Sequence, residues 1–380
     1  MPTVTIDYTP AYEQGGGIGR YVRDLVNALA AADQKTDYRL FVAGANIANL
    51  PAAPGENFVW RATTLTPRWL ARLWHRAQIP LPVDVFTGKS DLYHATDFVL
   101  PPVSRGTRTL LTVHDLSFVR VPEAASPNLK AYLDKVVPRS VHRADHILAD
   151  SAATRQDLID LYGVSPDKIT VLLSGVDQRF QPASTIDQQV VRTKYQLADW
   201  PYVFSVGTVQ PRKNYGRIIE ALAQLRSTGS PLHLVVAGGR GWLEDPIYAT
   251  VQATGMADRV HFIGFADEAD LNALYSAAAC VAFPSLYEGF GLPVLEAMAC
   301  GVPVFTSNRS SLPEVAGDVA PMVDPYDTAA IAQAIHNLTE DEPLRQQLIQ
   351  VGFEHIKAFT WAQSAAQLYE IYNRLLTSDL

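Results

Sequence analysis

Two carboxylates enclose a glycine-containing segment late in the chain, Glu288-Gly-Phe-Gly-Leu-Pro-Val-Leu-Glu296. An apolar, strand-like run at residues 280–283 precedes it, and Pro293 occupies a position that the first turn of a helix tolerates. The free amides at the start of that helix would be those of Gly289, Phe290, Gly291 and Leu292. Because a helix start carries partial positive charge, the segment predicts an anion site. Glu288 and Glu296 would then suit the hydroxyl groups of a ribose and a sugar; the alternative is that both only complement the helix dipole.

A pair of cations follows an earlier strand-like run. Residues 202–206 are apolar, Gly207 comes next, and Arg212 and Lys213 follow after a short loop. Arginine offers a planar two-pronged donor and lysine a compact charge, a combination that suits a diphosphate. The alternative is an ordinary solvated surface pair.

The first half of the chain contains two weaker candidates. Gly16 and Gly17 lie in a glycine-rich turn between a strand-like run and an amphipathic helix, and they would let a ligand approach the backbone closely. The turn lacks the spacing of dinucleotide-binding loops, and a simple tight turn is the alternative. His114 and Asp115 end another strand-like run, where a structural histidine is the alternative. Ser151 fits the N-cap of a helix that continues to residue 161.

Strands that alternate with helices would hold these groups in place. Strand-like runs occur at residues 4–8, 38–43, 110–113 and 146–149, and again at 202–206, 232–237, 260–263, 280–283 and 303–306. This alternation predicts parallel sheets covered by helices on both faces, in two doubly wound α/β domains with a ligand cleft at the carboxyl ends of the strands. We place the domains at residues 1–185 and 186–360, and we expect an amphipathic helix over 361–380 to cross back to the first domain.

Composition excludes several classes of protein. Lys and Arg number 31 against 39 Asp and Glu, a formal charge of −8, which argues against a nucleic-acid coat. Cys280 and Cys300 cannot form a disulfide framework or a four-cysteine zinc site, and we expect both to be small buried hydrophobes. No secretory leader is evident, and no apolar run is long enough to span a membrane. We therefore expect a cytoplasmic protein.

Together these motifs resemble the nucleotide-sugar glycosyltransferases of family 4, which have the two-domain GT-B fold. The resemblance covers nearly the whole chain and is carried most by the Glu288–Glu296 spacing, then by the order of the glycine turn, His114-Asp115, Ser151/Thr154 and Gly207…Arg212-Lys213-Asn214. It implies that Arg212 and Lys213 hold the donor diphosphate, Glu296 the ribose and Glu288 the sugar hydroxyls. It further implies that His114 reaches the transferred sugar near the reacting carbon. The backbone around Ile263, in residues 262–265, would contact the base.

The resemblance also implies retention of anomeric configuration. The leaving nucleoside diphosphate would be stabilised by the prepositioned cations and amides, and it needs no protonation by an enzyme acid. The chain contains no Asp-x-Asp sequence, so we predict transfer that requires no metal and no other cofactor. The resemblance favours GDP-mannose over UDP-glucose as donor and a glycan or lipid-linked acceptor.

Three other functions are alternatives to a glycosyltransferase. Gly88-Lys89-Ser90 with Asp267-Glu-Ala-Asp270 could suggest a nucleotide-hydrolysing helicase, but the P-loop spacing is wrong because Val83 stands where its first glycine would be. A nucleotide-sugar epimerase and a non-catalytic nucleotide-sugar sensor would use the same fold, and activity assays separate them from a transferase.

Membrane contact is a separate expectation. The basic and aromatic stretch between Arg61 and Pro82 would suit peripheral contact with the anionic inner face of a membrane. The alternative is a helix that packs Trp69, Leu70 and Leu73 inward.

Overall fold

The computed structural model describes residues 1–377, and its contacts divide the chain into two compact units. Unit 1 comprises Met1–Leu116, Ala131–Gly175 and the C-terminal residues from Thr360. Unit 2 comprises Ser117–Lys130 and Val176–Phe359. Each unit is described by itself.

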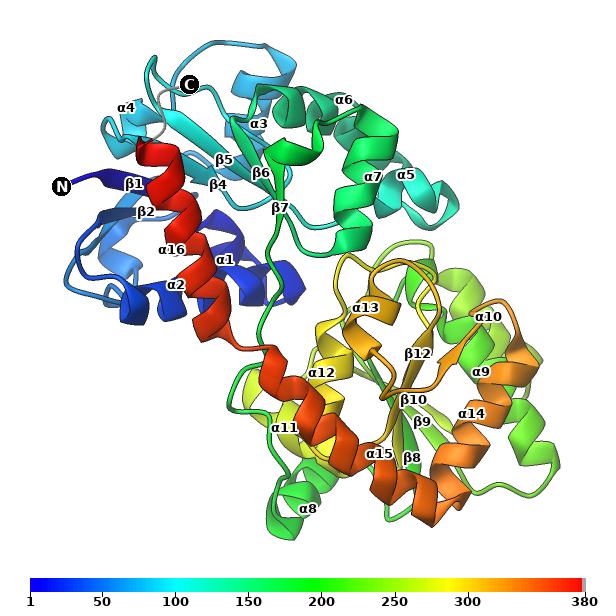
Figure 1. Ribbon diagram of the computed structural model, residues 1–380. Coiled ribbons are helices and arrows are strands. Elements are labelled where there is room, and N and C mark those ends of the chain that lie inside the picture. The colour runs from blue at the N-terminus through cyan, green and yellow to red at the C-terminus, as the bar shows by residue number, and fades with distance from the viewer. Residues whose placement is uncertain (378–380) are drawn as a thin grey trace. The chain divides into compact units, whose positions relative to one another are not determined.

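Unit 1 is built on a seven-stranded parallel sheet with the order β3-β2-β1-β4-β5-β6-β7 (Figure 1). Its strands are β1 (Thr3–Asp7), β2 (Asp37–Ala43), β3 (Phe58–Thr63), β4 (Leu92–Ala95), β5 (Arg108–Val113), β6 (His146–Ala149) and β7 (Ile169–Val171). Its helices are α1 (Thr9–Glu13), α2 (Gly17–Ala32), α3 (Pro67–Ala71), α4 (Asp84–Thr87), most of α6 (Pro127–Arg143), α7 (Ala152–Tyr162) and α16 (Trp361–Thr377).

Unit 2 is built on a six-stranded parallel sheet with the order β10-β9-β8-β11-β12-β13. Its strands are β8 (Tyr202–Val206), β9 (His233–Ala237), β10 (Val260–Gly264), β11 (Cys280–Phe283), β12 (Val304–Ser307) and β13 (Met322–Val323). Its helices are α5 (Ser117–Arg120), α8 (Thr185–Lys194), α9 (Tyr215–Ser227), α10 (Asp245–Ala253), α11 (Glu268–Ser276), α12 (Leu292–Ala299), α13 (Leu312–Ala316), α14 (Thr328–Glu340) and α15 (Glu342–His355).

The two doubly wound parallel sheets that the sequence predicts are confirmed. All nine predicted strands are present, and their ends move by at most two residues. Ser151 caps α7 as expected, because its Oγ accepts a hydrogen bond from the Thr154 amide. Cys280 and Cys300 are buried free thiols, as expected.

Each sheet has one point at which the strand order reverses. In unit 1 the chain runs outward in one direction from β1 to β3 and in the other from β4 to β7, so the reversal lies between β1 and β4. In unit 2 it lies between β8 and β11. Loops leave such neighbouring strands in opposite directions and open a crevice at their carboxyl ends, where ligands bind in this class of fold.

Close packing of the first two helices requires a glycine. A Cβ atom on Gly19 of α2 would lie 1.9 Å from the carbonyl oxygen of Gln14, which follows α1. The same helix buries Tyr21, Val22 and Leu25 in the core of unit 1, and α16 packs along it (Figure 1). The glycine therefore lets the turn after α1 pack against α2.

We expect Gly19→Ala to lower the free energy of unfolding by about 1–3 kcal/mol, because a backbone atom must move to admit the methyl group. Gly17→Ala is the matched control, since a Cβ atom there meets nothing within 4 Å. Chemical denaturation of both variants checks this. Equal stability of the two would contradict the close approach.

Candidate active site

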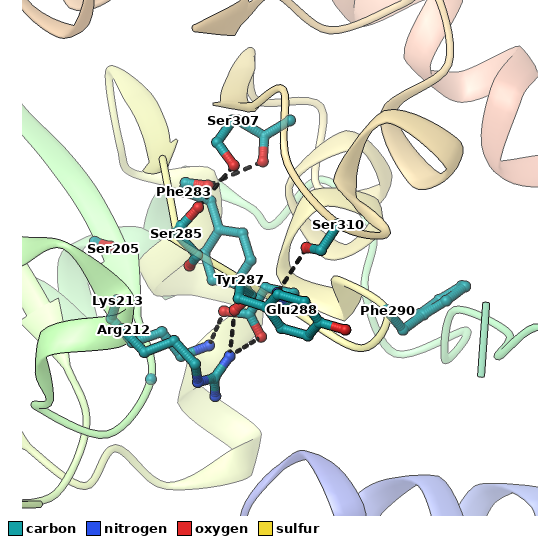
Figure 2. A network of polar contacts seen from close by, with 12 residues as sticks. Ser205, Arg212, Lys213, Phe283, Ser285, Tyr287, Glu288, Phe290, Ser307 and Ser310 are labelled. Carbon is teal, nitrogen blue, oxygen red and sulfur yellow. Dashed lines mark hydrogen bonds and ion pairs between the residues drawn. The ribbon is translucent and has the colours of Figure 1, made fainter. Parts of the chain in front are cut away.

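Arg212, Lys213 and Glu288 meet at the reversal point of unit 2. The Glu288 Oε2 atom lies 2.6 Å from Arg212 Nη1, and Oε1 lies 2.7 Å from Lys213 Nζ. Figure 2 shows the two cationic side chains converging on this carboxylate. Arg212 also donates to the Tyr287 carbonyl at 2.7 Å. The sequence placed these three residues at strand ends, and the structure brings them into one cluster.

The two loops that carry the cluster are joined to each other. The loop after β8 contains Arg212, whose carbonyl accepts a hydrogen bond from the Leu286 amide in the loop after β11. Asn214 adopts a left-handed backbone with φ of 63° and donates from Nδ2 to the carbonyls of Pro284 and Pro325. Backbone hydrogen bonds and the Asn214 side chain therefore hold the cations and the carboxylate in place. This role of Asn214 was not predicted from the sequence.

Glu288 is anchored through its main chain. Its amide donates to Ser310 Oγ at 2.8 Å, and its carbonyl accepts from Ser311 Oγ at 2.9 Å. Ser311 Oγ also lies 2.6 Å from the Phe290 carbonyl. Neither serine was a sequence candidate, since a Ser-Ser pair in a loop is not distinctive. These contacts fix the backbone and leave the Glu288 side chain to be oriented by the two cations.

The cluster is largely shielded from water. The side chains of Arg212, Lys213 and Glu288 are 16%, 11% and 10% exposed. Burial by itself would raise the pKa of Glu288, but the charges of Arg212 and Lys213 outweigh it and lower that pKa to about 2. The carboxylate is therefore ionised at neutral pH, and the cluster carries one net positive charge.

The remaining donor-site candidates of unit 2 lie after β8, at the start of α12 and, for Ile263, in β10. Gly207 ends β8 with φ of 135°, and a Cβ atom there would lie 2.8 Å from Lys213 Cε. Gly291 precedes α12 with φ of 127°, and Pro293 lies in the first turn as predicted. Phe290 is buried, and Gly289 and Leu292 complete the start of α12. Ile263 lies in β10 and is partly exposed.

Glu296 lies inside the protein. It is 1% exposed, and its Oε2 atom accepts a hydrogen bond from the Tyr275 hydroxyl at 2.7 Å. Its position one turn into α12 is as predicted. Its contact with a ribose stays a prediction.

The other candidates belong to unit 1. Gly16 is the N-cap of α2 and Gly17 its first residue, and a Cβ atom on either would meet nothing within 4 Å. His114 follows β5. Its Nδ1 atom lies 2.7 Å from Asp150 Oδ2, and its Nε2 atom lies 2.9 Å from the Thr96 carbonyl. Because a carbonyl can only accept, Nε2 carries a proton, and a carboxylate at Nδ1 favours a second one.

The charge of His114 follows from these partners. Burial alone would lower the pKa of the imidazole, but the adjacent Asp150 carboxylate overcomes this effect and raises it to about 9. Asp115 is the neighbour in sequence, yet it is Asp150, just after the adjacent strand β6, that bonds the ring. His114 is therefore an imidazolium at neutral pH and has no free base to offer in this conformation.

The stretch from Arg61 to Pro82 departs from the inward-packed helix that was the alternative to membrane contact. It contains the end of β3, the short helix α3 and one irregular helical turn at Arg72–Arg76. Leu70 is buried, but Trp69 is 55% exposed, so the expectation that Trp69 packs inward is wrong. The Arg72 guanidinium lies 4.8 Å from the centroid of the Trp69 ring. The surface here is both cationic and aromatic.

Neither a cluster of metal ligands nor a membrane-spanning helix occurs within residues 1–377. No group of three or more His, Cys, Asp or Glu side chains there is placed to hold a metal ion. Within the same residues, no helix has the length and apolar character needed to cross a bilayer.

We expect Asp150→Asn to lower the pKa of His114 well below about 9, because it removes the carboxylate that most strongly opposes the effect of burial and leaves the weaker influence of Asp97. Nuclear magnetic resonance titration of the ring measures this directly. Since folding raises this pKa, the stabilisation from the pair is complete below about pH 6.5 and is lost as the pH rises through about 9. The titration of His75, on the same unit, should not change; a pKa of His114 that stays high would contradict the role of Asp150.

Two family models together match most of the chain. The model of glycosyltransferase family 4 matches residues 15–180, and the model of glycosyl transferases group 1 matches residues 187–355. O-antigen chain mannosyltransferase B of Escherichia coli is 32% identical, over 94% of this chain and 96% of its own length. The E. coli serotype-specific mannosyltransferase WbdA is 29% identical over 95% of this chain, which spans 45% of that protein.

Solved structures give the same result for the fold. A sucrose-phosphate synthase from Thermosynechococcus elongatus has a TM-score of 0.76 and 25% identity, covering 99% of both chains. Anabaena HepE, in complex with UDP and glucose, has a TM-score of 0.72 and 20% identity, covering 98% of this chain and 99% of its own. The predicted GT-B fold is confirmed. The chain belongs to the family 4 glycosyltransferases, and it is a hexosyltransferase.

Proposed function

We propose that this enzyme transfers mannose from GDP-mannose to a glycan or lipid-linked acceptor, with retention of configuration and without a metal ion. The observation that carries the proposal is the pair Arg212 and Lys213, held out of water at the reversal point of the unit 2 sheet. The relatives named as mannosyltransferases favour mannose over glucose. UDP-glucose is the second donor to test.

The electrostatics of the site suit departure of a nucleoside diphosphate. Cleavage of the bond between the anomeric carbon and the phosphate oxygen leaves negative charge on the diphosphate. Arg212 and Lys213 are already oriented and dehydrated, so they stabilise that charge most strongly as it develops in the transition state. These two charges supply what a divalent cation supplies in other transferases, which supports the proposal of metal-independent transfer.

Retention follows if the acceptor attacks on the face from which the diphosphate leaves. The departing phosphate oxygen then takes the proton of the acceptor hydroxyl, and no enzyme base is required. His114 fits this scheme as a positive charge rather than as a base, because both ring nitrogens are engaged by acceptors. A covalent route would need a further carboxylate at the sugar, and none was indicated by the sequence.

We also propose peripheral membrane contact through the exposed surface around Trp69 and Arg72. An amphipathic indole beside guanidinium groups favours the interface of an anionic bilayer, which is where a lipid-linked acceptor would be presented. Arg68 and Arg76 belong to the same short segment and add to its positive charge.

A donor panel tests the proposed activity. GDP-mannose at 100 times its dissociation constant should add about 2.7 kcal/mol to the free energy of unfolding, and slow hydrolysis or transfer should release GDP in the presence of a chelator.

Lys213→Ala should lower the rate of transfer by a factor on the order of 10²–10³. Lys194→Ala, which removes a lysine paired with Asp267 and Asp270 elsewhere in unit 2, is the matched control. A free epimerised nucleotide sugar would instead indicate an epimerase, and binding without turnover on a broad acceptor panel would indicate a sensor.

Vesicle flotation tests the membrane contact. The protein should float with anionic vesicles and not with neutral ones, and Trp69→Ala should reduce the bound fraction several-fold. Tyr326→Ala is the matched control, because Tyr326 is another exposed ring covered by a guanidinium, that of Arg217. Equal binding of both variants, or none by the wild type, would contradict this contact.

A further inference from the structure

The Glu288 carboxylate bonds Arg212 and Lys213 in the way that a diphosphate would bond them. One carboxylate oxygen bonds each cation, at 2.6 and 2.7 Å, so the two oxygens bridge the two positive charges (Figure 2). A diphosphate held by an arginine and a lysine presents oxygens in the same way. Carboxylate and diphosphate therefore compete for one pair of cations.

We infer that Glu288 is an internal counter-ion that the donor diphosphate must displace, and that this exchange makes the site prefer the donor to the nucleoside diphosphate product. This inference rests on the proposed function. It goes beyond that function by giving Glu288 a second role, in the release of product.

The exchange is required by charge. Dehydrated charges of like sign in contact repel strongly, so a diphosphate cannot approach the cations while an ionised carboxylate lies between them. The carboxylate stays ionised at neutral pH because of the same two cations. It must therefore move away when the diphosphate binds.

The contacts of Glu288 allow this movement. Ser310 and Ser311 hold the peptide groups on either side of the Glu288 α-carbon, so the exchange needs only rotation of the side chain. Lys213 is meanwhile held over the face of the Phe283 ring, at 4.6 Å from its centroid, and can keep its place. The cations stay and the anion is replaced.

The displaced Glu288 carboxylate gains new partners from the donor but not from the product. With a sugar attached, the released carboxylate finds new partners in the sugar hydroxyls, and its displacement is compensated. After transfer, the product offers no hydroxyl groups of a sugar there, so the displaced carboxylate is left without that compensation. Return of Glu288 to the cations would drive that product off.

Binding of GDP and GDP-mannose to Glu288→Gln tests the inference by calorimetry. The amide removes the competing charge at nearly constant shape, so GDP should bind about tenfold more tightly than to the wild type, a difference of about 1.4 kcal/mol. GDP-mannose should gain less or bind more weakly, which reduces the preference for donor. Product inhibition by GDP should strengthen in parallel.

Glu268→Gln is the matched control, because it neutralises a carboxylate paired with Arg179 elsewhere in unit 2 and should leave GDP affinity unchanged. Glu288→Asp should tighten GDP binding to an intermediate degree, because its shorter side chain cannot bridge both cations equally. This variant replaces Glu288→Gln in the test if Glu288→Gln does not fold. GDP binding that is unchanged or weaker in Glu288→Gln, with wild-type binding intact, would overturn the counter-ion role alone. If neither protein binds GDP, UDP or their sugar derivatives, the proposed function fails together with it.

Discussion

The constraint on which the site of unit 2 depends is that Arg212 and Lys213 lie side by side with little access to water. Two dehydrated cations are tolerated only when an anion and well-placed acceptors balance them, because desolvation of an uncompensated charge costs several kcal/mol. Glu288 supplies that anion and the Tyr287 carbonyl one of the acceptors. The loops after β8 and β11 are consequently tied to one another before any ligand binds, and a ligand meets a site that is already organised.

Backbone segments pack closely against each other at the strand ends next to this cluster. A Cβ atom on Gly238, just after β9, would lie 1.9 Å from the Gly207 carbonyl oxygen, and one on Gly241 would lie 2.5 Å from that of Val209. The loops after β8 and β9 can therefore lie against each other only because glycines replace side chains there. The neighbouring Tyr215 hydroxyl donates to the Gly207 carbonyl, which adds a further tie between the strand end and α9. The positions of the charges thus follow from the close packing of uncharged backbone.

The sequence predicted nine of the strands and the residues that follow them, because parallel strands are buried on both faces and appear as apolar runs. It did not predict which side chains would pair. The Arg212–Glu288 contact joins the loops after two strands that are neighbours only because the order reverses between β8 and β11. The Asp150–His114 contact likewise needs β5 and β6 to be adjacent. Strands β3, β4, β7 and β13 are not among the nine predicted; β7 has three residues and β13 has two, which is too few to show a periodicity. The sequence left the exposure of Trp69 open, because an apolar residue on a short helix gives no sign of it.

The two sheets place charge at their strand ends in opposite arrangements. In unit 2 one carboxylate lies between two cations, and in unit 1 the imidazolium of His114 lies among carboxylates that include Asp97 and Asp150. Burial, only partly offset by the charge of His114, raises the pKa of Asp97 to about 6, so this second cluster titrates close to neutral pH while the first does not. A change in pH between 5 and 7 therefore alters the charge around His114 and leaves the cations of unit 2 and their partner unchanged. The charge of the unit 2 cluster stays constant in that interval, so any dependence on pH of nucleoside diphosphate binding at these cations should arise from the phosphate itself.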